Sequence, residues 1–259
     1  MTDDQWAEGD VVALKSAGRP VVLVPLGRGP VRVGDEGVVD LTAQLGRAPG
    51  GAVSWLGREY RAVRPSLADL LGSVHRGAQI VTAKDAAHLL LLAGVAPGDH
   101  VVEAGSGSGA LTIVLAHAVG RSGHVTSFDR RADFLQAARA NVVRSGLDDR
   151  VTFRERDVAR DGIDVHDVGS VVLDLPEPWA VLHSAHEALR VGGYVATYTP
   201  TYNQLERTVQ ELRHQGFDDV RALEVIERGI QVGEGGTRPA FEMLGHTGFL
   251  AAGRRIVGP

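Results

Sequence analysis

The chain has 259 residues, no cysteine, 44% hydrophobic residues and a formal net charge of −5. This apolar content is enough for a folded core, and a chain without cysteine cannot form disulfides or thiolate metal sites. The acidic balance argues against an indiscriminate nucleic-acid-binding protein, because such proteins tend to be basic. No apolar run is long enough to span a bilayer, and the acidic start MTDDQWAEGD lacks a signal-peptide pattern. We therefore expect a cytoplasmic protein with no membrane association.

The first part of the chain, residues 9–63, consists of short valine-rich segments separated by glycine and proline. Alternation at this spacing predicts a small β-sheet or β-barrel. The pattern ends at Arg64-Pro65-Ser66, where Pro65 favours an extended residue before it and Ser66 is placed to cap a helix over 67–73. We expect residues 1–64 to form an N-terminal small β domain and residues 65–259 to form a second domain.

From residue 84 onward, strand and helix patterns alternate. This alternation predicts an α/β fold with a doubly wound, Rossmann-like sheet of seven strands. The last two strands, which flank a loop over 229–245, fit a terminal antiparallel hairpin. The predicted helices are 84–94, 110–119, 132–145, 179–189 and 204–215, and the predicted strands are 100–104, 124–129, 151–155, 170–175, 193–198, 221–227 and 247–252. Ligands bind such sheets at the carboxyl ends of the strands.

A glycine-rich turn joins the first of these strands to its helix, in V-V-E-A-G-S-G-S-G-A-L-T at 101–112. Gly105, Gly107 and Gly109 allow the backbone to approach a ligand closely. Glu103 precedes them, and its carboxylate suits a cationic amine better than a pyrophosphate. We therefore predict S-adenosylmethionine (SAM), which carries an amino group and a sulfonium. Gly105, Gly107 and Ala110 also satisfy the G-x-G-x-x-G/A pattern, so a nicotinamide-dependent dehydrogenase remains the alternative on these residues alone.

Acidic and aromatic side chains occur at the ends of the following predicted strands. Asp129 is placed to accept both ribose hydroxyls, and Asp157 to accept a hydrogen bond from an adenine amino group. Asp174 ends a buried strand, where an unpaired carboxylate costs desolvation free energy, so we expect it to have a function. Prolines stiffen the loop between Asp174 and Trp179, and Tyr198 ends the next strand. An acid, a rigid loop and an aromatic ring favour recognition of a flat, amine-bearing base.

Several stretches together resemble the tRNA (adenine-N1)-methyltransferases, which methylate adenosine 58, or adenosines 57 and 58. The resemblance covers about residues 64–254, and its most specific parts are L-D-x-x-x-P-W and G-H-T-x-F-L. The stretches are R-P-S-L-A-D (64–69), R-G-A-Q-I-V…K-D-A (76–86), E-A-G-S-G-S-G-A-L-T (103–112), L-D-L-P-E-P-W (173–179), Y-T-P-T…Q (198–204), R-P (238–239) and G-H-T-G-F-L (245–250). It implies a class I SAM-dependent methyltransferase domain preceded by a small β domain, a tRNA substrate and a homotetramer.

The resemblance also implies roles for individual residues. Asp174 corresponds to the proposed catalytic aspartate of the family. The expected cofactor-binding residues are Gln79, Ile80, Val81, Glu103, Gly105, Gly107, Ser108, Gly109, Ala110, Leu111, Asp129, Arg130, Phe134, Asp157, Val158 and Asp174. The expected substrate-binding residues are Trp179, Tyr198, Arg76, Arg228 and Arg238. The sequence shows no metal-ligand cluster, so no metal is expected, and we expect His246 to fix the hairpin or a subunit contact.

Two other functions remain open at this point. Many relatives have Tyr-Pro where this chain has Thr82-Ala83. The lost ring and the acidic balance favour a small-molecule or nucleoside substrate with the same methyl-transfer chemistry. A catalytically idle subunit that supports an active partner is the other alternative. The glycine turn with Glu103, together with Asp174, argues against it.

Overall fold

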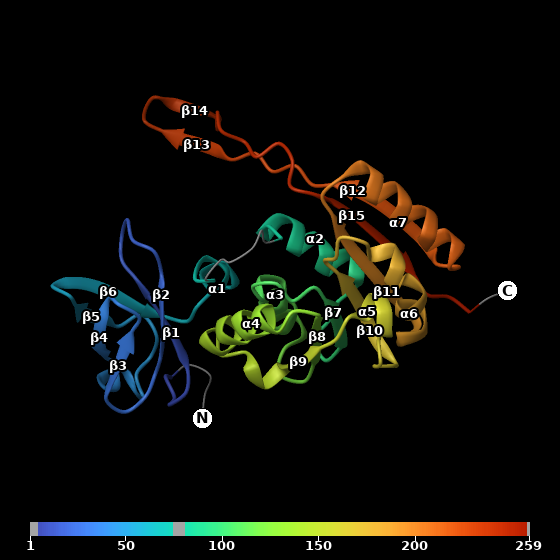
Figure 1. Ribbon diagram of the computed structural model, residues 1–259. Helices are drawn as coiled ribbons and strands as arrows, with labels where there is room; N and C mark the ends of the chain where they lie inside the picture. Colours follow the sequence, from blue (N-terminus) through green and yellow to red (C-terminus); the bar gives the residue numbers. More distant parts are fainter. Residues whose placement is uncertain (1–4, 75–80, 258–259) are drawn as a thin grey trace.

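The computed structural model describes residues 5–74 and 81–257, and it contains two main β-sheets (Figure 1). The N-terminal sheet is antiparallel, with strand order β2-β1-β6-β5. Its strands are β1 (Val11–Lys15), β2 (Val22–Pro25), β5 (Ala52–Trp55) and β6 (Arg58–Val63); a separate hairpin is formed by β3 (Pro30–Val33) and β4 (Gly37–Asp40), and the short helix η1 covers Thr42–Gln44. Trp6, Leu14, Leu41 and Trp55 are buried between these elements and form a separate apolar cluster.

A short helix, α1 (Leu67–Gly72), follows the N-terminal sheet. The Ser66 hydroxyl accepts a hydrogen bond from the backbone N–H of Asp69 at 3.2 Å, and the Asp69 carboxylate accepts from the backbone N–H of Ser66 at 2.9 Å. This capping box satisfies two helix-terminal donors and confirms the predicted cap at Ser66. Asp69 also accepts from Lys15 Nζ at 2.8 Å, so α1 is joined to strand β1.

The second sheet has seven strands in the order β12-β15-β11-β10-β7-β8-β9. They are β7 (His100–Ala104), β8 (His124–Asp129), β9 (Val151–Glu155), β10 (Val168–Leu173), β11 (Leu189–Thr199), β12 (Asp218–Glu224) and β15 (Phe249–Arg254). The strands β11, β10, β7, β8 and β9 pair in parallel, whereas β15 is antiparallel to both of its neighbours. The predicted α/β class, the parallel order and the terminal antiparallel pair are therefore confirmed.

Helices cover both faces of this sheet (Figure 1). Successive strand residues point to opposite faces: Val101 belongs to the apolar cluster under α2, α3 and α4, and Val102 to the cluster under α6 and α7. The helices are α2 (Ala83–Ala93), α3 (Ala110–Val119), α4 (Ala132–Arg144), α5 (Val158–Asp161), α6 (Leu182–Ala188) and α7 (Tyr202–His214), with short 3₁₀ helices η2 (Asp148–Arg150) and η3 (Pro178–Val181). Because both faces are covered, the carboxyl edge of the strands remains the accessible part of the sheet.

The segment between β12 and β15 differs from the prediction of a loop. Within it, β13 (Ile230–Gly233) and β14 (Gly236–Pro239) form an antiparallel hairpin. We call residues 226–245 the arm, because they extend away from the sheet (Figure 1). Glu234 and Gly235 form the two-residue turn, a connection that suits a tight hairpin. None of the helices in the described ranges is long and apolar enough to cross a membrane.

Candidate active site

A cavity of about 600 Å³ opens at the carboxyl ends of the parallel strands. Gly105, Asp129, Asp157, Asp174 and Tyr198 all line it, and they lie at or just beyond the ends of β7, β8, β9, β10 and β11. The strand order reverses between β7 and β10, and a reversal of this kind leaves a crevice for a ligand. The cavity therefore lies where the sequence predicted a ligand site.

Apart from Glu103, the structure separates the predicted cofactor-binding residues into three groups. The residues that line the cavity are Val81, Gly105, Gly107, Asp129, Arg130, Phe134, Asp157, Val158 and Asp174. Ser108, Gly109, Ala110 and Leu111 are buried around the first turn of α3 and do not line it. Gln79 and Ile80 lie outside the described residues. The first and second groups show that the glycine turn exposes its beginning to the cavity and buries its end.

The predicted substrate-binding residues are more dispersed. Tyr198 lines the cavity, whereas Trp179 does not, and the Trp179 ring lies 4.3 Å from the guanidinium carbon of Arg207. Arg228 and Arg238 belong to the arm, where Arg228 Nε donates to the Ala240 carbonyl at 3.4 Å. Arg76 lies outside the described residues. Among the described members of this set, only Tyr198 lines the cavity.

Sequence reasoning missed several cavity residues. They are Phe128, Arg131, Arg156, Ala159, Leu175, Pro176, Glu177, Pro200 and Gln204. Gln204 Nε2 donates to the Pro176 carbonyl at 2.9 Å, so α7 holds the loop that follows Asp174. The position of Gln204 in the Y-T-P-T…Q stretch was the available signal. The others lie beside predicted residues on the same strand ends, and no local pattern distinguishes them.

The position of Glu103 corrects the expectation that its side chain faces the ligand crevice. It is fully buried beneath the glycine turn and does not line the cavity. Its Oε2 accepts hydrogen bonds from the Thr112 hydroxyl at 2.6 Å and from the Ser127 hydroxyl. Its Oε1 has no partner among the described residues. Burial raises the pKa of Glu103 to about 8, against the two hydroxyl hydrogen bonds, and the charges of Asp174 and Asp129 add to the rise.

Asp174 is held beside the glycine turn by its backbone. Its N–H donates to the Ala104 carbonyl at 2.9 Å. A Cβ at position 105 would lie 2.1 Å from the Asp174 carbonyl oxygen, so this close approach requires Gly105. No described residue donates a hydrogen bond to the half-buried Asp174 carboxyl. Burial and the charge of Asp129 raise its pKa to about 7.

Two further cavity acids, Asp129 and Asp157, are fixed by backbone donors. Asp129 accepts hydrogen bonds from the N–H groups of Gly107, at 3.2 Å, and Arg131, at 3.0 Å. Asp157 caps α5 by accepting from the N–H of Ala159 at 3.2 Å. These bonds hold both carboxylates in place, and their oxygens still face the cavity. Arg130, Arg131 and Arg156 also line the cavity and nearly balance its acids, so it is the carboxylates at the strand ends, rather than the net charge, that suit a cationic group of a ligand.

Comparison with known proteins identifies the family of the chain. A family model described as "tRNA methyltransferase complex GCD14 subunit" matches residues 65–237. The chain belongs to this family. A curated family relative, "tRNA (adenine(57)-N(1)/adenine(58)-N(1))-methyltransferase TrmI" of Methanocaldococcus jannaschii, is 36% identical over 76% of this chain and 79% of its own length. A "tRNA (adenine(58)-N(1))-methyltransferase TrmI" of Thermus thermophilus is 37% identical over 85% of this chain and 87% of its own length. Membership sets the nicotinamide-dependent alternative aside.

Solved structures agree with this assignment. A SAM-dependent O-methyltransferase from Thermotoga maritima aligns over 100% of this chain and 97% of its own, with a TM-score of 0.80 and 31% identity. The tRNA (m1A58) methyltransferase TrmI from Aquifex aeolicus aligns over 98% of this chain and 100% of its own, with a TM-score of 0.73 and 25% identity. The chain therefore has the class I methyltransferase fold that the resemblance implied.

Proposed function

We propose that the chain transfers a methyl group from SAM to N1 of adenosine in the T-loop of tRNA, at position 58 or at positions 57 and 58. Family membership and the activities named for the relatives support the reaction. The observation that carries the assignment to this chain is Asp174, a carboxyl at the cavity edge of β10 to which no described residue donates a hydrogen bond. A carboxylate in that position can accept a hydrogen bond from the amino group of a base.

The residues around the cavity fit SAM. The unpartnered buried oxygen of Glu103 and the cavity carboxylates of Asp129 and Asp174 favour a cation, and SAM carries a sulfonium and an amino group. We propose that the glycine turn, with the charge of the buried Glu103 carboxyl beneath it, holds the amino-acid end, that Asp129 holds the ribose, and that Asp157 and Phe134 hold the adenine. Val81, Arg130 and Val158 would complete the pocket. SAM, when bound, supplies an electrophilic methyl group.

The chemistry needs little from the protein beyond positioning and charge. Adenine N1 has an in-plane lone pair, so no base is required to activate it. The ring becomes positively charged as N1 gains the methyl group, and the exocyclic amine becomes a stronger hydrogen-bond donor. The Asp174 carboxylate, accepting from that amine, stabilises the developing charge; this is electrostatic preorganisation. The stacked adenosine must first leave the folded RNA, at a cost of a few kcal/mol.

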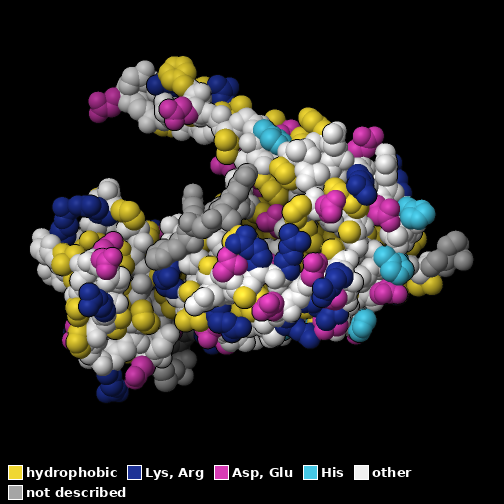
Figure 2. Space-filling view, viewed as in Figure 1, with side chains coloured by type: hydrophobic (Ala, Val, Ile, Leu, Met, Phe, Trp, Pro, Cys, Tyr) yellow, Lys and Arg dark blue, Asp and Glu magenta, His cyan; other side chains and the backbone are white. Residues whose placement is uncertain are grey.

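The assembly that we propose is a cytoplasmic homotetramer that binds tRNA. Hydrophobic side chains are exposed along the arm (Figure 2), among them Val232 at 81% and Phe241 at 82%. Exposed apolar surface of this kind suits burial against another subunit. We further propose that residues 1–64 form a domain that helps to hold tRNA, and that Arg76, Arg228 and Arg238 contact its phosphates while Trp179 supports the base-binding loop.

Methyl transfer to an unmodified tRNA transcript, followed by digestion and mass spectrometry, tests this function. We expect 1-methyladenosine from the wild type and its loss in an Asp174→Ala variant that still binds SAM. Asp148→Ala is the matched control, because Asp148 is an exposed acid on η2. Full activity of the Asp174→Ala variant would refute the role of this carboxyl. Methylation of free adenosine but not of tRNA would instead support the small-molecule alternative, and SAM binding without turnover on either would support an idle subunit.

A further inference from the structure

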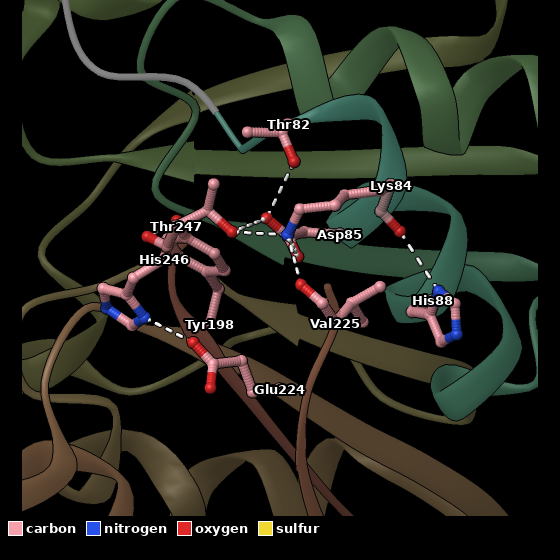
Figure 3. Close-up of polar contacts among 9 residues, drawn as sticks. All are labelled: Thr82, Lys84, Asp85, His88, Tyr198, Glu224, Val225, His246 and Thr247. Carbon is pink, nitrogen blue, oxygen red and sulfur yellow. Dashed lines mark hydrogen bonds and ion pairs between the residues drawn. The ribbon is translucent and has the colours of Figure 1, made fainter. Parts of the chain in front are cut away.

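A buried ion pair lies at the start of α2, near Tyr198 (Figure 3). Tyr198 lines the cavity. Lys84 Nζ and Asp85 Oδ1 are 2.8 Å apart, and their side chains are 10% and 0% exposed. Asp85 Oδ2 accepts hydrogen bonds from the hydroxyls of Thr82, at 2.8 Å, and Thr247, at 2.7 Å. A buried pair needs such additional partners to offset desolvation, and this pair has them.

The Lys84 ammonium has no donor left for a ligand. Besides Asp85, it donates to the Thr247 hydroxyl at 2.6 Å and to the Val225 carbonyl at 2.7 Å. An ammonium has three hydrogens, so all three are used. A role in binding RNA phosphate or SAM is thereby excluded for Lys84. Lys84 instead holds the end of β12 and the loop before β15, which are the two points where the arm joins the sheet.

The loop before β15 in turn holds Tyr198. The Tyr198 hydroxyl donates to the Thr247 carbonyl. A Cβ at Gly248 would lie 2.4 Å from the Tyr198 ring, so the ring lies directly on the backbone at this glycine. Burial raises the pKa of Tyr198 to about 12, with contributions from the charges of Asp85 and Asp174. The phenol therefore stays neutral, and its hydroxyl donates its proton to the Thr247 carbonyl. Tyr198 thus contributes to the cavity as a lining side chain and not as an acid or base.

We propose that Lys84, Asp85 and Thr247 are positioning residues that fix the ring of Tyr198 against the cavity. The connection runs from the ion pair to the Thr247 hydroxyl, and from the Thr247 backbone to the Tyr198 hydroxyl and ring. This network connects the K-D and G-H-T-G stretches, which are far apart in sequence, and both support Tyr198 at one side of the cavity. As a role in methyl transfer, this inference rests on the proposed function.

The test uses the full chain with the variants Thr247→Val, Thr247→Ser and Tyr198→Phe. Thr247→Val removes the hydroxyl but keeps the shape, and Thr247→Ser restores the hydroxyl. The matched control is Thr126→Val, because Thr126 is a buried threonine of β8 whose hydroxyl bonds His100, at 2.9 Å, and no other described residue. The first readout is the ring resonances of ¹³C-labelled tyrosine, with the Tyr198 signal assigned through Tyr198→Phe. The second readout is the kinetics of methyl transfer to tRNA.

We expect Thr247→Val to move the Tyr198 resonance and to lower kcat about ten- to a hundredfold through misplacement of the ring. The SAM Kd and the KM for tRNA should change little. Thr247→Ser should restore both readouts, and Thr126→Val should affect neither. An unmoved resonance, or a moved resonance with an unchanged kcat, would overturn the proposal. If the wild type does not methylate tRNA, the proposed function fails, and the resonance alone then decides whether the network holds Tyr198.

Discussion

Binding of SAM should be coupled to proton release, because two carboxyls of the site are largely or partly protonated in the free protein. With a pKa of about 8, Glu103 is roughly nine-tenths protonated at pH 7, and Asp174, with a pKa of about 7, is half protonated. A cationic ligand favours the ionised forms of both groups. Complete ionisation would release between one and one and a half protons per molecule bound, by linkage of the two equilibria.

The affinity should follow the same linkage. Below the pKa that a coupled carboxyl has in the free protein, each unit by which the pH falls weakens SAM binding about tenfold, or about 1.4 kcal/mol. With both carboxyls fully ionised in the complex, we expect the Kd for SAM to be about a hundred- to a thousandfold weaker at pH 6 than at pH 8. Isothermal titration calorimetry in two buffers of different ionisation enthalpy measures both the Kd and the proton count.

The Glu103→Gln variant distinguishes the pH dependence caused by the protein from the pH dependence caused by the ligand. The amide oxygen can still accept from Thr112 and Ser127, so the local packing is kept. The amino group of SAM itself titrates near this range, and its contribution is the same in both proteins. We expect the variant to bind more weakly than wild type, with a larger difference at pH 8 than at pH 6. Equal slopes of Kd against pH in the two proteins would refute the assigned role of Glu103.

The same carboxyls predict the stability of the unliganded protein. Their pKa values are raised in the folded state, so the folded protein binds more protons than the unfolded chain between about pH 4 and pH 8. Stability is then greatest at low pH within this window and falls as pH rises through the folded pKa values. SAM should therefore raise the melting temperature more at pH 8 than at pH 6.

Three further predictions concern the frame of the site. Gly105→Ala should destabilise the protein by about 1–3 kcal/mol more than Gly107→Ala in urea unfolding: both have positive φ, but only the first puts a Cβ against backbone; equal losses would contradict the close approach. Glu224→Gln should lower the raised pKa of His246, since this carboxylate is its largest stabilising partner, and an unchanged value in an NMR titration would exclude the pairing. Asp69→Ala should cost about 1–2 kcal/mol of stability by removing one of the two bonds of the capping box and the ion pair with Lys15; chemical denaturation within error of wild type would contradict this.

The local elements around the seven-stranded sheet could be predicted from the sequence. The predicted strands 100–104, 124–129 and 151–155 and the helix 110–119 coincide with β7, β8, β9 and α3. Each has a hydrophobic period and a clear boundary residue, and both are local properties of the chain. The acids at the strand ends followed from the same pattern, since parallel strands end at one edge of a sheet.

Tertiary structure alone decided how those residues share the site. The sequence placed the Glu103 carboxylate in the crevice, whereas α3 and β8 supply hydroxyls that hold it beneath the turn. The arm was expected to be a loop, because its short strands offer too little alternation to be distinguished from irregular chain. The bond from Lys84 to Thr247 joins residues 163 positions apart. Such contacts depend on how the elements pack, and no local pattern of residues records that packing.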